Sequence, residues 1–98
     1  MKSFKEINNI LHEHLPSLRE QFGIARLGVF GSVVRGEQSP ASDVDILVDF
    51  EQPIGLIRFM QLESHLATLV GSKVDLVTRK ASKPTIGKRI LAEVRYVN

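Results

Sequence analysis

Three aspartates lie in stretches of sequence that otherwise favour apolar residues. Asp43 and Asp45 are two residues apart at the start of an apolar run, and Asp75 lies between Val74 and Leu76. Side chains alternate along a strand, so Asp43 and Asp45 leave the same face, about 6 to 7 Å apart along the chain. Like charges on one face repel unless a cation compensates them. This all-oxygen ligand set favours a hard divalent cation, with Mg²⁺ as the first choice.

A second pattern, Gly31-Ser32, lies where a predicted strand gives way to a short helical turn. Free backbone N–H groups and the positive end of a helix dipole make such a junction a site for anions. Gly31 lets a phosphate approach the backbone closely, and Ser32 could add a hydroxyl donor. Gly36 permits the turn that leads back to Ser42 and Asp43. The sequence therefore predicts a phosphate site beside the metal ligands, as a metal-bound nucleoside triphosphate requires.

Each of these residues also has a structural interpretation. Ser32 could instead cap the short helix, and Asp75 alone could be an edge-strand charge that discourages aggregation. Asp43 alone could be a strand-start or loop residue. Arg35 either contacts phosphate or forms an ion pair that holds the motif loop, and the sequence favours neither. Asp49 continues the alternation but lies near the end of its strand, where a solvent-facing role is predicted.

The elements that must position these residues follow from the spacing of apolar residues. Residues 4–22 carry the stripe of an amphipathic helix, which Pro16 interrupts. Because proline breaks a helix interior, we expect two short helices that meet near Leu15 and end at Gly23. Residues 24–30 are β-branched and aromatic enough for a strand.

The remainder of the chain alternates between strands and helices in the same way. A helical turn is predicted at 32–37, a loop at 38–42, and a strand buried on both sides at 43–50. The last three predicted elements are a helix at 54–70, a strand at 73–78, and a final helix that carries Ile86, Ile90, Leu91, Val94 and Val97. Three strands interleaved with helices predict an α+β domain, a small mixed β-sheet with helices packed on it.

Length and composition restrict the remaining possibilities. The 98 residues allow one compact domain, 1–98, and the net charge is +2. No cysteine is present, which excludes disulfides, thiol nucleophiles and Cys-containing zinc sites. The amino terminus lacks the apolar region of a signal peptide, and no run approaches the roughly 18 apolar residues of a membrane span. A cytoplasmic protein that makes no membrane contact is the resulting expectation.

Taken together, these motifs resemble a known family. Gly31-Ser32-Val33-Val34-Arg35-Gly36, Ser42-Asp43-Val44-Asp45 and Asp75 closely resemble the GSxxRG…SDxD…D signature of minimal nucleotidyltransferases in the DNA polymerase β-like superfamily. The resemblance spans nearly the whole chain and implies the polymerase β-like nucleotidyltransferase core. It also implies two Mg²⁺ ions and ATP as the substrate. The residues so assigned are Asp43, Asp45 and Asp75 for catalysis and metal binding, and Gly31, Ser32, Arg35, Gly36 and Ser42 for the nucleotide.

The resemblance also implies a partner. Many such proteins resemble the antitoxin of a two-gene module whose toxin is a HEPN-domain ribonuclease, and the antitoxin transfers AMP from ATP to a toxin tyrosine. In that mechanism the hydroxyl attacks the α-phosphorus, pyrophosphate leaves, and Asp75 could take the proton. A candidate interface is the basic carboxy-terminal segment, including Lys80, Lys83, Lys88 and Arg89.

Two other functions stay open at this stage. A non-catalytic antitoxin would neutralise its partner by binding and occlusion, although it would have no reason to retain three repelling carboxylates. The acceptor could also be a nucleic acid, although one Tyr and no Trp leave little aromatic surface for base stacking and so argue against a nucleic acid as a direct ligand.

Overall fold

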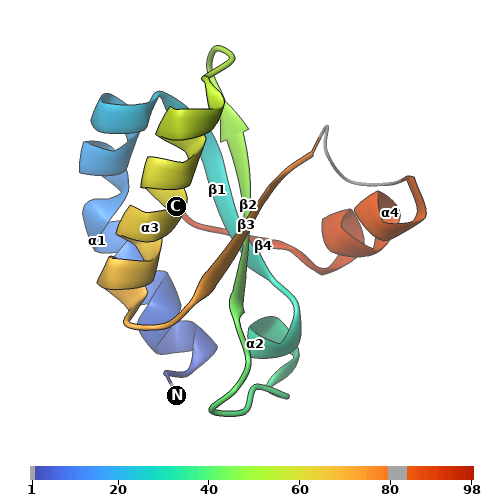
Figure 1. Ribbon diagram of the computed structural model, residues 1–98. Coiled ribbons are helices and arrows are strands. Elements are labelled where there is room, and N and C mark those ends of the chain that lie inside the picture. The colour runs from blue at the N-terminus through green and yellow to red at the C-terminus, as the bar shows by residue number, and fades with distance from the viewer. Residues whose placement is uncertain (1, 80–83) are drawn as a thin grey trace.

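The computed structural model describes residues 2–79 and 84–98, and for residues 84–86 it describes the backbone alone. The predicted α+β class is confirmed: a four-stranded mixed sheet has α1 and α3 against one face, with α2 and α4 on the other side (Figure 1). The elements are α1 (Phe4–Phe22), β1 (Ile24–Phe30), α2 (Ser32–Arg35), β2 (Val44–Phe50), α3 (Leu56–Val70), β3 (Val74–Thr78), α4 (Pro84–Glu93) and β4 (Arg95–Tyr96). No helix in the described part is both long and apolar enough to span a bilayer.

The strand order is β3-β2-β1-β4, which places β2 inside the sheet. β2 runs antiparallel to β1 and parallel to β3. Val44, Ile46 and Val48 are fully buried in the core shared with α1 and α3. Because side chains alternate, Asp45 and Asp49 lie on the opposite face of the sheet. The buried stripe on β2 therefore fixes which face carries the carboxylates.

The predicted break in the first helix is wrong, because α1 continues through Pro16 from Phe4 to Phe22. Its start is fixed by a capping box between Ser3 and Glu6, and its end by Gly23 in the left-handed conformation, as predicted. The buried residues Leu11, Leu15 and Leu18 lie before and after the proline on one face. Pro16 itself is exposed, so the backbone hydrogen bond that it cannot donate is lost on the solvent side of the helix. The packed leucines on the buried side hold the helix together.

Replacing Pro16 with alanine is expected to stabilise the protein. Alanine restores the N–H that donates to the His12 carbonyl, and it removes the clash of the proline ring with that carbonyl. The free energy of unfolding should rise by about 1 to 3 kcal/mol in urea titrations. Ser17→Ala, at the exposed next position, is the control and should change it by about 0.5 kcal/mol or less. A Pro16→Ala protein that is less stable than the wild type would contradict this explanation of the helix.

The carboxy-terminal end also differs from the prediction. α4 ends at Glu93, and β4 follows, where Tyr96 pairs with Gly28 of β1. Val97 is buried, and its N–H donates to the Leu27 carbonyl at 2.8 Å. The expected helix to Val97 is therefore wrong: that residue is buried by strand pairing. Of the other predicted positions, Ile90 is buried and Leu91 is 46% exposed, while the Ile86 side chain lies outside the described part.

Candidate active site

Asp45 and Asp75 are paired residues on the neighbouring parallel strands β2 and β3. Paired residues on adjacent strands project from the same face, about 4.8 Å apart in the hydrogen-bonding direction. Asp43 lies two residues before Asp45, just outside the strand. Burial, followed by the charges of Asp75 and Asp43, raises the pKa of Asp45 to about 6. The three predicted carboxylates therefore act on one another electrostatically.

The three carboxylates are near one another without enclosing a common point. Among residues 2–79 and 84–98, no three acidic, histidine or cysteine side chains come close enough together to hold a metal ion. Like charges repel where no cation lies between them. The donor set nevertheless fits Mg²⁺, because all three side chains offer carboxylate oxygens. A nearby cation would also counter the raised pKa of Asp45 and keep this carboxylate ionised below about pH 6.

The backbone of Gly31, directly after β1, lies against the Asp45 carboxylate. Its φ of 82° and ψ of −156° are accessible to glycine and strained for other residues. A Cβ at this position would overlap the Asp45 carboxylate. The sequence predicted that Gly31 allows a close approach to the backbone, and in the structure the group that approaches is Asp45. The Gly31 N–H, which was predicted to bind phosphate, donates instead to Glu93 at 2.7 Å.

Ser32 is the first residue of α2, and Gly31 holds the capping position without any side-chain hydrogen bond. Ser32 is therefore not the helix cap. Its hydroxyl has no hydrogen-bond partner among the described residues. The first N–H groups of a helix, here those of Ser32 and Val33, also lack partners within the helix. These donors are where a phosphate could bind.

Gly36 and Ser42 shape the connection between the phosphate and carboxylate positions. Gly36 ends α2 at a φ of 73°, in the left-handed region that was expected for the turn. The Ser42 hydroxyl accepts a hydrogen bond from the Ser39 N–H at 2.9 Å, and the Ser42 N–H donates to the Ser39 carbonyl at 2.9 Å. Ser42 thus closes the loop directly before Asp43.

Arg35 forms the ion pairs that were one of its two predicted roles. Its guanidinium contacts Glu93 at 2.6 Å and Glu37 at 2.9 Å. Glu93 is the residue that sequence reasoning missed. It lies 58 positions from Arg35, and nothing in its local sequence distinguishes it from an ordinary helical glutamate.

Asp49, for which the sequence predicted a solvent-facing role, is partly exposed and is paired with two arginines. Its carboxylate lies 3.2 Å from Arg79 and 3.6 Å from Arg26. Both guanidiniums also donate to the Tyr96 hydroxyl, at 2.9 and 3.1 Å. Asp49 lies on the same face as Asp45 but is neutralised by arginine, so the unpaired negative charge is concentrated at the start of β2.

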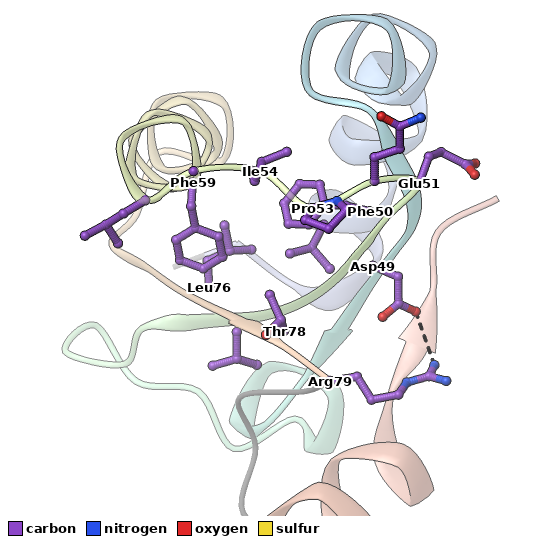
Figure 2. Close-up of a pocket in the computed structure, with 14 residues that line it drawn as sticks. Asp49, Phe50, Glu51, Pro53, Ile54, Phe59, Leu76, Thr78 and Arg79 are labelled. Atoms are coloured by element: carbon purple, nitrogen blue, oxygen red, sulfur yellow. Dashed lines mark ion pairs between the residues drawn. The ribbon is translucent and has the colours of Figure 1, made fainter.

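A cavity of about 640 Å³ lies at the ends of β2 and β3 that are away from the three carboxylates (Figure 2). Its walls include Phe50, Ile54 and Phe59, and the ion pair between Asp49 and Arg79 lies on one side. None of the predicted catalytic or nucleotide-binding residues lines it. This cavity is therefore separate from the carboxylate site.

Comparison with known proteins agrees with this fold. Residues 11–97 match the model of the nucleotidyltransferase domain. The chain is 50% identical to Thermococcus cleftensis protein adenylyltransferase MntA over 97 residues, which cover 99% of this chain and 98% of that protein. The protein therefore belongs to the nucleotidyltransferase domain family, and the predicted resemblance to minimal nucleotidyltransferases is confirmed.

Solved structures show the same fold. One, described provisionally as a minimal nucleotidyltransferase, aligns with a TM-score of 0.80 at 33% identity and covers 96% of this chain and 95% of that chain. Another is the tri-AMPylated Shewanella oneidensis HEPN toxin in complex with its MNT antitoxin. It aligns with a TM-score of 0.68 at 19% identity, over 93% of this chain and 71% of that chain.

Proposed function

We propose that this protein transfers AMP from ATP to a tyrosine hydroxyl of a HEPN-domain toxin, in a Mg²⁺-dependent reaction that makes it the antitoxin. The observation that carries the proposal is the pairing of Asp45 with Asp75 beside the Gly31-Ser32 turn. The name of the Thermococcus relative, a protein adenylyltransferase, supports the reaction. The AMPylated HEPN toxin bound to an antitoxin of the same fold supports the partner.

The nucleotide and metal roles divide between the two motifs. Asp43, Asp45 and Asp75 would hold two Mg²⁺ ions, which when bound would neutralise the triphosphate and stabilise an in-line displacement. The Ser32 hydroxyl and the first N–H groups of α2 bind phosphate oxygens. Gly31 keeps the Asp45 carboxylate in place against the backbone, where no side chain intervenes.

The transfer itself requires one proton acceptor. The tyrosine oxygen forms a bond to the α-phosphorus of ATP, while the bond from that phosphorus to the bridging oxygen of pyrophosphate breaks. Asp75 is exposed on the edge strand β3, where a docked protein can reach it, and it takes the phenolic proton. Asp45 is half-buried and contributes by charge and position.

A protein acceptor fits the open position of the carboxylates. Asp75 is exposed on the edge strand β3, so a docked protein can bring its hydroxyl to this face of the sheet. In the proposed reaction the partner supplies the surroundings of that hydroxyl. Of the basic residues predicted to contact it, Lys88 and Arg89 are exposed on α4, and Lys80 and Lys83 lie outside the described residues.

A growth assay separates catalysis from occlusion. Cells that express the HEPN toxin should recover with wild-type antitoxin and with Asp49→Asn, which removes an arginine-paired carboxylate on the same face. The double variant Asp43→Asn, Asp45→Asn should bind the toxin in a pull-down but fail to restore growth. Full protection by the double variant would show that occlusion is sufficient and would contradict the proposal.

A further inference from the structure

Glu93, the last residue of α4, ties that helix to the turn after β1. Its Oε1 atom accepts a hydrogen bond from the Gly31 N–H at 2.7 Å and another from Arg35 Nη1 at 2.6 Å. The Glu93 side chain is only 22% exposed. Charge-assisted hydrogen bonds of this length belong to the strong class in proteins. Two residues of the GSxxRG motif are therefore held by one carboxylate from the far end of the chain.

The peptide that Glu93 holds is the one against which Asp45 lies. The Gly31 carbonyl accepts hydrogen bonds from the N–H groups of Val34 and Arg35, at 3.1 and 3.2 Å. The Gly31 Cα lies so close to the Asp45 carboxylate that a Cβ would not fit between them. Gly31 is thus fixed by α2 on one side and by Glu93 on the other. Movement of this peptide would shift the surface that confines the Asp45 side chain.

We infer that Glu93 is a positioning residue of the transfer site, which fixes the Gly31 peptide and Arg35 and through them the place of Asp45. A carboxylate in this position could instead act as a competitor, since it occupies an N–H that a phosphate would use. The two roles predict opposite results when the carboxylate is removed. Loss of a positioning residue slows transfer, whereas loss of a competitor tightens ATP binding.

Steady-state kinetics test this role, and their interpretation rests on the proposed function. Glu93→Ala should lower kcat by about 10 to 100-fold with KM for ATP within about threefold, because reacting groups tolerate little misplacement. Glu93→Gln keeps an acceptor oxygen at the same reach and should retain kcat within about threefold. Glu37→Ala is the matched control, because it removes the other carboxylate bound to Arg35 and leaves the Gly31 contact intact. Should Glu93→Ala fail to fold, Glu93→Leu keeps the side-chain volume without an acceptor.

The contact itself is tested independently by the NMR resonance of the Gly31 amide proton in the nucleotide-free protein. That resonance should move upfield in Glu93→Ala, towards the position of a weaker hydrogen bond, and should stay in place in Glu37→Ala. Tighter ATP binding by Glu93→Ala with unchanged kcat would overturn the inference, and so would a Gly31 amide that does not move. If wild-type protein transfers no AMP, the proposed function fails, and the amide resonance still decides whether Glu93 holds the turn.

Discussion

Asp45→Asn is expected to abolish AMP transfer and, in the absence of metal, to stabilise the fold. Asparagine removes a negative charge that the triphosphate-bound metals require, so the transfer rate should fall by about a thousandfold or more. Burial, followed by the charges of Asp75 and Asp43, raises the pKa of this group from 3.8 to about 6. Ionised Asp45 is therefore less favourable in the folded state than in the unfolded state, and it destabilises the metal-free protein at neutral pH.

The sign of the pH dependence follows from the same shift. Because the folded pKa lies above the unfolded one, the folded state binds the extra proton, and wild-type stability falls as the pH rises from about 4 to about 6. Solvent screening of this half-buried group reduces the expected gain for Asp45→Asn at pH 7.5 to about 1 kcal/mol. Thermal unfolding of the wild type and of Asp45→Asn in EDTA, at pH 4.5 and pH 7.5, measures this gain in stability.

The control for this prediction is Asp49→Asn. Asp49 lies on the same strand and face but is paired with Arg26 and Arg79, so its loss should slightly destabilise the protein and leave transfer intact. Addition of Mg²⁺ should raise the thermal midpoint of the wild type more than that of Asp45→Asn. An Asp45→Asn protein that is less stable than the wild type at pH 7.5 in EDTA would contradict this electrostatic account of the site.

Gly31→Ala is expected to have the second large effect. The alanine methyl group would overlap the Asp45 carboxylate, and alanine is strained at a φ of 82°. Both penalties act at once, so we expect a loss of about 2 to 4 kcal/mol in stability and at least a tenfold loss of transfer. Chemical denaturation and initial-rate measurements on the same preparation check the two effects.

Gly36→Ala provides a matched comparison five residues away. Gly36 has a similar φ of 73°, but no atom lies within 4 Å of the position that its Cβ would take. The substitution should therefore cost only the backbone strain, about 1 kcal/mol, and should lower transfer much less than Gly31→Ala does. Equal losses of transfer in the two alanine variants would show that the overlap with Asp45 is not what makes Gly31 necessary.

Local patterns were enough to predict much of this fold. The strand at 24–30 has the bounds that its β-branched composition predicted, and the short turn at Gly31 follows directly. The two-residue spacing of Asp43 and Asp45 predicted that their carboxylates lie together. The prediction that Asp75 joins them depended on β3 being the neighbour of β2, which the structure shows. These are short-range signals, in which the residues that determine a conformation lie within a few positions of one another.

The errors arose where distant residues decide the outcome. Pro16 does not break α1, because tertiary packing of the flanking leucines outweighs its local preference. The strand β4 was missed because Val94 and Val97 fit a helical spacing, and only pairing with β1 distinguishes the two conformations. The contact of Glu93 with Gly31 joins residues 62 positions apart, and no local pattern predicts it.

The most direct test of the central claim is label transfer to the HEPN toxin from ATP labelled at the α-phosphate. With Mg²⁺ and wild-type protein, label should appear on a toxin tyrosine, and it should disappear with EDTA or with the Asp43→Asn, Asp45→Asn double variant. ATP labelled at the γ-phosphate should leave the toxin unlabelled, because pyrophosphate is the leaving group. A stable, inhibited complex that never acquires the α-label would contradict the proposed adenylyl transfer.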